Sequence, residues 1–296
     1  MVPVRVLDQV TVSNTIPSTF QFVGSEDPPR RRVPIVVVIP AYNEEGAIKR
    51  VVESTTKVLG TLANKMDVIV DHEIIVIDDG SKDKTRQILD SLGIHKFYHR
   101  KNMGKGYAIR NASRFIHNGE IVVLMDGDGE HDPSDIPCLV EPVVNGRADM
   151  TIGSRFMASR REVTTYLGRE KKRKHVHVFG NRLFSFLLWC FTRKTITDTQ
   201  SGFRAFKGVV LKSLRPSAEG FRIEMEMTVK AIKRNFTIVE VPVTNGHGAR
   251  DSHLDPVIDG AKILLTIFRE CLPRRVSWFF DWLLPRLPSR VGSLLG

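Results

Sequence analysis

Three acidic side chains stand close together in the middle of the chain, directly after a run of apolar residues. Asp126, Asp128 and Glu130 alternate with glycines and follow the apolar segment 121–125. That segment is typical of a buried strand, and side chains at positions i and i+2 of an extended chain point the same way. Adjacent carboxylates repel each other unless a cation lies between them, and oxygen ligands suit Mg²⁺ or Mn²⁺. We therefore predict a divalent metal site with these residues as ligands, and an acidic surface turn is the alternative.

The composition is that of a folded, basic protein. The 296 residues are 42% hydrophobic and 26% charged, which is enough for one large domain or two smaller ones. The net charge of +11 favours a polyanionic partner, such as an anionic membrane surface or a phosphorylated substrate. We do not expect nucleic acid as the partner, because no recognised nucleic-acid motif accompanies the charge. No apolar stretch approaches the roughly 18 residues of a membrane-spanning helix.

Apolar runs alternate with amphipathic segments from residue 34 onwards. This alternation is typical of an α/β fold with a mostly parallel central sheet that is covered on both faces. Residues 1–33 lack a clear period and are interpreted as an N-terminal leader. Buried strands are predicted at residues 35–39, 73–77 and 121–125, a weaker strand at 95–99 and a fifth strand at 149–152.

Polar side chains gather where the predicted strands end. Ligands bind at the carboxyl ends of strands in a parallel sheet, so these loops are expected to meet at one site. Any one loop alone is better explained as a solvated turn, but four together favour a binding site. The chain has no P-loop motif, which argues against a P-loop NTPase. The residues concerned are Tyr42, Glu44, Asp78, Asp79, Lys105, Asp126 and Asp128.

Six short motifs occur in an order that is similar to a known family. They are Pro40-Ala41-Tyr42-Asn43-Glu44-Glu45, Asp78-Asp79-Gly80-Ser81, Gly104-Lys105-Gly106, Asp126-Gly127-Asp128, Gly153-Ser154-Arg155-Phe156 and Ser201-Gly202-Phe203-Arg204. The set resembles the family 2 inverting glycosyltransferases of GT-A (Rossmann-like) fold, and most of all the polyprenyl-phosphate (dolichyl-phosphate) mannose and glucose synthases. The resemblance implies transfer of a hexose from GDP-mannose, or from UDP-glucose as the next choice, to a lipid phosphate with Mg²⁺ or Mn²⁺ as cofactor.

The resemblance also implies a role for each motif residue. Asp126 and Asp128 would hold the metal on the donor diphosphate, and Glu130 stands where the synthases often have glutamine. Asp78 and Asp79 would face the base and the ribose, with the choice between them open. Further substrate-binding residues implied in the same way are Pro40, Ala41, Tyr42, Glu44, Lys105, Gly127, Arg155, Arg204, Arg250 and Ser252.

The acceptor decides whether the reaction needs a base. A lipid phosphate is already anionic, so it requires positioning rather than proton removal. A hydroxyl on a glycolipid or glycerophospholipid would require a carboxylate to take its proton. Glu224 and Glu226 are the candidates, with Asp198 as a weaker one. The expected catalytic set is Asp126, Asp128, Arg155, Arg204 and Glu224.

Two parts of the chain carry basic and aromatic residues side by side. A basic run over residues 160–174 precedes an aromatic stretch at 183–191, and the apolar residues 258–272 precede another at 276–284. Such patterns are typical of amphipathic helices in the surface of an anionic membrane. We predict a peripheral enzyme on the cytoplasmic face, and a homodimer interface is the alternative use of the C-terminal segment. The expected division is a leader at 1–33, a nucleotide-sugar-binding half at 34–155, an acceptor-binding half at 156–255 and interfacial helices at 256–296.

Overall fold

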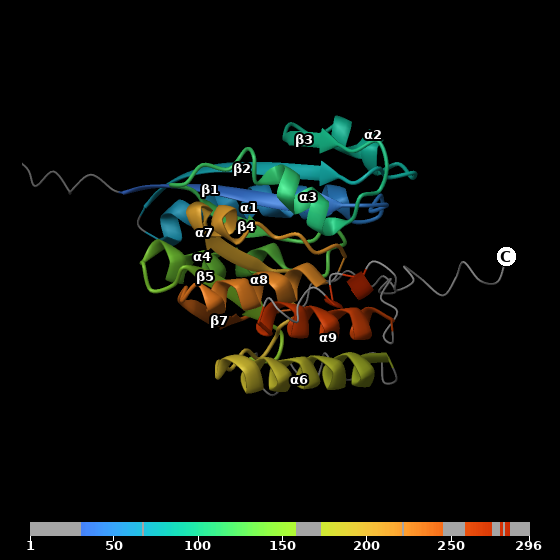
Figure 1. Cartoon of the computed structure of the whole chain (residues 1–296). Coiled ribbons are helices and arrows are strands. Elements are labelled where there is room, and N and C mark those ends of the chain that lie inside the picture. The colour runs from blue at the N-terminus through green and yellow to red at the C-terminus, as the bar shows by residue number, and fades with distance from the viewer. Residues whose placement is uncertain are drawn as a thin grey trace, which may run out of the picture. The chain divides into compact units, whose positions relative to one another are not determined.

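The computed structural model describes residues 31–66, 68–157, 173–220, 222–244, 258–273, 279–280 and 282–284. These residues belong to one structural unit that spans Arg31–Gly296. Most of the predicted leader, residues 1–30, lies outside the described residues. Within the described part of the chain, a seven-stranded sheet carries helices on both faces, as the alternating sequence pattern predicts (Figure 1).

The sheet is parallel except for one strand. Its order is β3-β2-β1-β4-β6-β5-β7, and β6 runs antiparallel to both of its neighbours. The strand β6 was not predicted, because its four residues have a basic side chain at each end and do not form an apolar run. The strands are β1 (Arg32–Ala41), β2 (Ile69–Asp78), β3 (His95–Tyr98), β4 (Ile121–Leu124), β5 (Met150–Ser154), β6 (Arg204–Lys207) and β7 (Ile238–Pro242).

Both faces of the sheet are buried, because successive side chains of a strand point to opposite sides. In β1, Ile35 and Val37 pack into one core, whereas Val36 and Val38 pack into the other. Side chains of α1 and α4 complete the first core, and side chains of α3, α7 and α8 complete the second. The helices are α1 (Ile48–Met66), α2 (Thr85–Asp90), α3 (Lys105–Ala112), η1 (Pro133–Asp135), α4 (Ile136–Val144), α6 (Arg173–Thr192), α7 (Gly208–Leu214), α8 (Arg222–Lys233) and α9 (Ile258–Cys271).

Two further helices, α6 and α9, lie on the side of the sheet that carries the second core. The helix α9 packs against α8, and α6 packs against α9 (Figure 1). The aromatic stretch 183–191 lies in α6, and α9 covers most of the apolar stretch 258–272. Of the predicted helix at 276–284, only Phe279, Phe280 and residues 282–284 are described, in helical conformation. None of the described helices combines the length and apolar character needed to cross a membrane.

The carboxyl ends of β1, β2 and β4 lie side by side. Ala41 pairs with Asp78 in the parallel register of β1 and β2, and Asp79 N donates to Ala41 O at 2.8 Å. Gly127 N, just beyond β4, lies 3.3 Å from Pro40 O. The loops that follow these strands therefore meet at one edge of the sheet, as the sequence predicts.

Candidate active site

The acidic residues Asp126, Asp128 and Glu130 lie in a tight turn rather than on an extended strand. The strand β4 ends at Leu124, and Gly129 turns the chain with a φ of +80°, a conformation that favours glycine. Glu130 N donates to Asp128 Oδ1 at 2.9 Å, which fixes the turn. The alternation of strand side chains therefore stops before these acids, and the structure corrects that step of the sequence-based argument.

Gly127 packs this turn against the end of β1. A Cβ at Gly127 would lie only 3.2 Å from Pro40 O and from the Cβ of Ala41. A larger side chain would push the acidic turn away from β1. Pro40, Ala41 and Gly127, all predicted to line the donor site, thus lie together at the junction of the first strand with the acidic turn.

Lys105 bridges two carboxylates beside the turn. Its Nζ lies 2.6 Å from Asp126 Oδ1 and 2.7 Å from Glu224 Oε1. Lys105 begins α3 and Glu224 lies in the first turn of α8, so residues from separate elements converge here. Gly202 leaves room for them, since a Cβ there would lie 2.6 Å from Asp126 Oδ2 and 2.7 Å from Lys105 Nζ. Sequence reasoning singled out the motif that contains Gly202, but it missed this role of the glycine.

Negative charge is in excess around the acidic turn. Burial raises the pKa of Asp128, and repulsion by Asp126 raises it further. Burial and the neighbouring Asp128 raise the pKa of Glu130 to about 7. Burial also opposes ionisation of Asp126, but Lys105 outweighs it and holds the pKa of that carboxyl below its usual range. His131 adds no compensating charge, because burial lowers its pKa and its Nδ1 accepts a hydrogen bond from Asp126 N at 3.1 Å.

The acidic turn has the donor chemistry of a divalent metal site. Carboxylate oxygens suit Mg²⁺ and Mn²⁺, and a cation would relieve the excess negative charge. In the part of the chain that the structure describes, no group of three or more His, Cys, Asp or Glu side chains is placed to hold a metal ion. The expected three-carboxylate set is therefore not assembled. Asp126 and Asp128 fit a metal that takes its remaining oxygens from a substrate, as Mg²⁺ commonly does with phosphates.

Asp78 and Asp79 organise the loops that follow β2. Asp79 accepts hydrogen bonds from Met103 N at 2.9 Å and Gly104 N at 2.7 Å, and its Oδ1 lies 2.6 Å from His99 Nδ1. Asp78 Oδ1 accepts a backbone N–H of the following turn at 3.0 Å. Both side chains are buried among these partners. The contacts of these two carboxylates with a base and a ribose stay a prediction, and the role that the structure gives both side chains is to hold the loops after β2.

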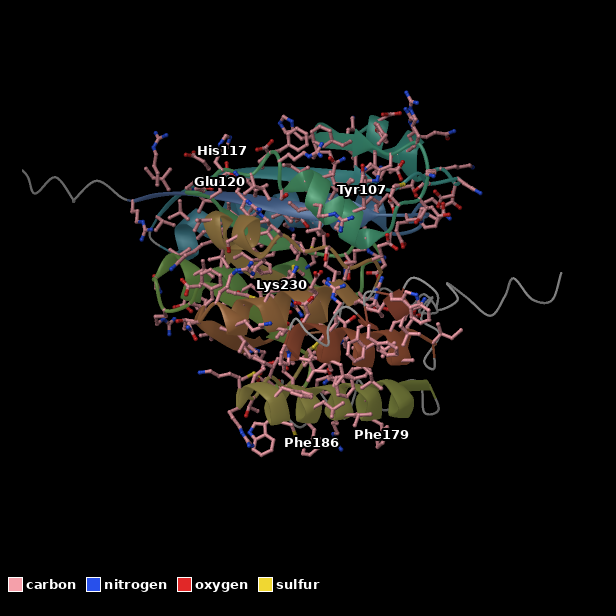
Figure 2. The ribbon with its side chains drawn as sticks, in the orientation of Figure 1. Tyr107, His117, Glu120, Phe179, Phe186 and Lys230 are labelled. Carbon is pink, nitrogen blue, oxygen red and sulfur yellow. The ribbon has the colours of Figure 1, made fainter. Side chains whose placement is uncertain are left out.

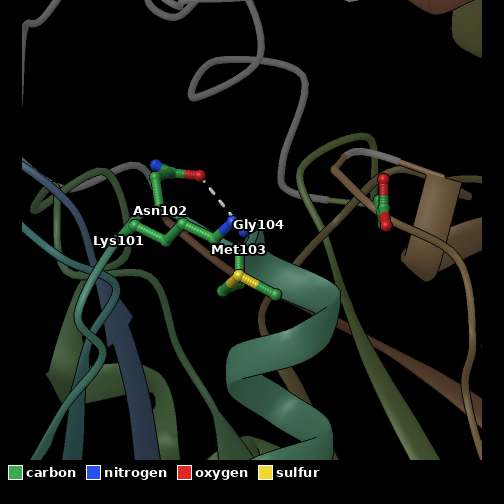
Figure 3. A pocket seen from close by; sticks show the side chains of 5 residues that line it. Lys101, Asn102, Met103 and Gly104 are labelled. Atoms are coloured by element: carbon green, nitrogen blue, oxygen red, sulfur yellow. Dashed lines mark hydrogen bonds between the residues drawn. The ribbon is translucent and has the colours of Figure 1, made fainter.

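The loop that Asp79 holds lines a cavity next to Lys105. Within the loop, Asn102 Oδ1 accepts a hydrogen bond from Gly104 N at 3.1 Å (Figure 3). Gly104 has a φ of +87° and immediately precedes Lys105 in the chain. The cavity has a volume of about 310 Å³ and is lined by Lys101, Asn102, Met103, Gly104 and Glu219.

The loop after β1 is tied to the loop after β2. Asn43 N donates to Ser81 Oγ at 2.8 Å, and Glu44 N donates to Thr85 Oγ1 at 2.7 Å. Tyr42 and Glu44 are half-buried. The structure thus brings the predicted residues of the first two loops together, as the sequence led us to expect.

The two arginines expected near the phosphates have different surroundings. Arg155 donates from Nε at 2.8 Å and from Nη2 at 3.0 Å to the two oxygens of Asp198, and its side chain is 23% exposed. Arg204 is fully buried and donates to Ser201 O at 2.7 Å and to Glu224 O at 2.9 Å. Arg204 therefore fastens β6 to α8, and a direct phosphate contact of this arginine does not fit its burial.

Asp198 is positioned by residues that sequence reasoning missed. Asp198 N and Thr197 N donate to the Glu240 carboxylate at 2.9 and 2.7 Å. Asn181 of α6 donates to Thr197 O at 2.6 Å and accepts from Thr199 N at 3.0 Å. The only sequence signal for Asn181 is an amide within an apolar helix. The predicted residues Arg250 and Ser252, and the basic run up to residue 172, lie outside the described residues.

Comparison with known proteins assigns the family. Residues 36–215 match the profile of glycosyl transferase family 2, which covers more than half of the chain. The chain therefore belongs to glycosyl transferase family 2, as the order of its motifs indicates.

Two archaeal relatives and one solved structure illustrate the similarity. Glycosyltransferase AglJ of Haloferax volcanii is 30% identical over 254 residues, which are 83% of this chain and 75% of AglJ. The UDP-N-acetylglucosamine–dolichyl-phosphate N-acetylglucosaminyltransferase of Methanococcus voltae is 30% identical over 230 residues, 71% of this chain and 84% of that protein. Glucosyl-3-phosphoglycerate synthase from Mycobacterium tuberculosis, solved with Mn²⁺ and UDP-glucose, aligns with a TM-score of 0.60 at 26% identity, over 82% of this chain and 80% of that one. The predicted GT-A fold class is thereby confirmed.

Proposed function

We propose that this protein is a metal-dependent inverting glycosyltransferase that moves a sugar from a nucleotide donor to a polyprenyl or dolichyl phosphate. One observation carries the proposal: the candidate bases Glu224, Glu226 and Asp198 are all buried and ion-paired. An acceptor that is already anionic needs no base, whereas a hydroxyl acceptor does. The site therefore suits a phosphate acceptor best.

Glu226 is the clearest of these cases. Its carboxylate accepts hydrogen bonds from Ser217 N at 2.7 Å and Ala218 N at 2.6 Å, and it lies 2.6 Å from Lys230 Nζ. These partners tie α8 to the loop before it, and none of them belongs to the acidic turn. Glu226 thus has a structural role in this proposal.

The acidic turn would assist departure of the nucleotide. Transfer leaves negative charge on the departing diphosphate, and a divalent cation bound there stabilises that charge as a Lewis acid. Asp126 and Asp128 would hold the cation, while Lys105 and Arg155 would add positive charge beside the phosphates. The Mn²⁺–UDP-glucose complex of the structurally similar mycobacterial synthase supports Mn²⁺ as the first metal to test.

We take a UDP-sugar as the first donor to test. The name of the Methanococcus voltae relative specifies a UDP-linked N-acetylglucosamine donor and a dolichyl phosphate acceptor, and the mycobacterial synthase was solved with UDP-glucose. GDP-mannose, which the overall resemblance to the synthases favours, is the alternative donor.

The helix α6 supports a membrane-bound acceptor, because it is apolar on two sides. Phe184 and Leu188 are buried in the second core, whereas Phe179 and Phe186 are 70% and 57% exposed and point away from the neighbouring helices (Figure 2). The helix contains no acidic residue, and Arg193 just beyond it lies over the half-exposed ring of Trp189. Aromatic and basic residues of this kind favour the surface of an anionic bilayer, where a lipid acceptor is embedded.

The test compares phosphorylated and unphosphorylated acceptors. The purified full chain is incubated with labelled UDP-N-acetylglucosamine, UDP-glucose or GDP-mannose, together with a short polyprenyl phosphate, the matching polyprenol, or a total membrane-lipid extract. Label should enter the organic phase with the phosphate and not with the polyprenol. Transfer should require Mn²⁺ or Mg²⁺, and Asp128→Ala should abolish it. Asp71→Asn is the matched control, because Asp71 is exposed and pairs with the exposed Arg32 on β1.

Each other outcome contradicts a separate part of the proposal. Product with the polyprenol, or only with the lipid extract, would move the function to a hydroxyl acceptor on another membrane lipid. Transfer that persists in EDTA would refute the proposed metal dependence. No transfer from any of the donors by a folded protein would refute the proposed reaction.

A further inference from the structure

We propose that the ammonium group of Lys105 is ion-paired with Asp126 in the metal-free protein, in the place of a metal cation. When a divalent cation binds to Asp126, Lys105 moves towards Glu224. The inference rests on the metal site of the proposed function. It makes Lys105 a competitor of the metal, and it makes Glu224 a positioning residue rather than a base.

The first observation is the unequal use of the two Glu224 oxygens. Glu224 Oε1 lies 2.7 Å from Lys105 Nζ, whereas Glu224 Oε2 is buried and has no hydrogen-bond partner among the described residues. Burying a carboxylate oxygen without a donor is unfavourable, so such an atom in a folded protein calls for an explanation. Here the unused acceptor stands next to an ammonium group that is shared with Asp126.

The second observation is the balance of charge. Lys105 serves two carboxylates at 2.6 and 2.7 Å, while Asp128 and Glu130 lie close by in the acidic turn. A divalent cation on Asp126 would repel the ammonium group at short range. Glu224 offers Lys105 one oxygen that it already contacts and a second, vacant oxygen at the same place, so the ammonium group can leave Asp126 without returning to water.

Neighbouring residues hold the backbone around Lys105, Asp126 and Glu224 in place. Arg204 Nη1 donates to Glu224 O at 2.9 Å, so the start of α8 is held to β6 while the Glu224 side chain is held by Lys105. Gly202 provides the space, because a Cβ there would lie within 2.7 Å of both Lys105 Nζ and Asp126 Oδ2. In this proposal the Lys105 side chain moves while the backbone around it keeps its place.

The experiment measures Mn²⁺ affinity without sugar or acceptor. Electron paramagnetic resonance reports free Mn²⁺ for the wild type, Lys105→Gln, Glu224→Gln and the double variant, first with the metal alone and then with UDP. Lys105→Gln keeps hydrogen-bond donors but removes the competing charge, so it should bind Mn²⁺ about tenfold more tightly, the scale of one charge-assisted pair. Glu224→Gln should bind it several-fold more weakly, because Lys105 then has only Asp126 as an ionised partner.

The double variant separates the inference from simple electrostatics. If Glu224 acts through Lys105, the Glu224→Gln change should have almost no effect once Lys105 is replaced. If Glu224 attracts the metal directly, the two effects should add, and the inference fails. Arg50→Gln is the charge control, because Arg50 is exposed and its guanidinium lies beside Gly129 of the same turn. A gain for Arg50→Gln as large as that for Lys105→Gln would also overturn the inference.

A second measurement covers variants that fold poorly. Without metal, Lys105→Gln and Lys105→Met should lower the Tm, and Mn²⁺ should raise the Tm of each variant more than that of the wild type. A purely structural lysine would lower the Tm without enlarging the shift caused by Mn²⁺. Unchanged or weaker Mn²⁺ binding, or none by any variant, would refute the competition. Transfer by the wild type is measured separately, so the proposed function stands or falls on its own assay.

Discussion

Replacing Glu226 with glutamine tests whether this carboxylate is structural or catalytic. Glu226 is fully buried and accepts backbone hydrogen bonds from Ser217 and Ala218 at 2.7 and 2.6 Å. Its Oε1 lies 2.6 Å from Lys230 Nζ and 3.4 Å from Arg269 Nη2, and these side chains are 17% and 18% exposed. Glu226→Gln keeps the shape but removes the charge and turns one acceptor into a donor that faces other donors.

The expected loss follows from these contacts. Breaking a buried ion pair by changing one partner costs about 3–5 kcal/mol. Lys230 and Arg269 keep some contact with water, so we expect the free energy of unfolding to fall by about 2–4 kcal/mol and the Tm by roughly 5–10 °C. Urea or thermal unfolding followed by circular dichroism measures the change. Glu141→Gln is the matched control, because Glu141 and its partner Arg147 are exposed, and it should cost about 1 kcal/mol or less.

The dependence on pH gives a second check. Burial opposes ionisation of Glu226, but hydrogen bonds from Lys230 and Ser217 outweigh it, so its pKa is lowered below the usual value of a glutamate. A lowered pKa means that the ionised form stabilises the fold above the unfolded-state pKa and that this stabilisation is lost as the pH falls through the folded-state pKa. The difference between wild type and Glu226→Gln should be complete at about pH 7 and should shrink below about pH 4.

The catalytic readout decides between the two roles. At a temperature where both proteins are folded, Glu226→Gln should keep kcat/KM for sugar transfer within about twofold, whereas loss of a general base costs about 10²–10⁴-fold. A variant with wild-type stability and a transfer rate reduced a hundredfold would refute the structural assignment. It would also remove the main argument for a phosphate acceptor.

Three further changes test other parts of the structure. Gly106→Ala should destabilise the fold by about 1–3 kcal/mol in urea unfolding, because its Cβ would collide with Ala218 O, and wild-type stability would refute this steric requirement for glycine. Phe186→Ser should weaken sedimentation with anionic vesicles and leave the Tm unchanged, since this ring is 57% exposed, and unchanged vesicle binding would exclude α6 as the membrane-facing surface. Asp198→Asn should raise the KM for the nucleotide-sugar more than it lowers kcat, because it weakens the paired hydrogen bonds that position Arg155, and an unchanged KM would separate Arg155 from donor binding.

The main strands were predictable because a strand that is buried on both faces requires an uninterrupted run of apolar residues. The run 35–39 has side chains in two cores at once, which requires apolar residues without interruption. The strand β6 has no such apolar run. It is four residues long, begins with a buried arginine and is followed directly by α7, so neither length nor pattern distinguishes it.

The site was predictable in position but not in the roles of its acids. The ends of parallel strands meet at one edge, which brought the expected loops together. A sequence gives the type of an acidic residue and not the donors around it. Asp79 became the anchor of the loop at Met103 and Gly104, and the acidic turn departed from strand geometry at Gly129.

The carboxylates of this protein can nevertheless be sorted by what already surrounds them. Protein donors hold the pKa of Asp198 and Glu226 below the usual range, so their charge is satisfied before any ligand arrives. Burial and neighbouring acids raise the pKa of Asp128 and Glu130, so their ionised forms are less well stabilised by the protein. A cation is therefore most stabilising at the acidic turn, where the removal of repulsion adds to direct attraction. Asp126 differs from both groups, because its partner Lys105 belongs to the site itself. If Asp126 holds the metal, as proposed above, the metal competes with Lys105, and the metal affinity should depend on this lysine.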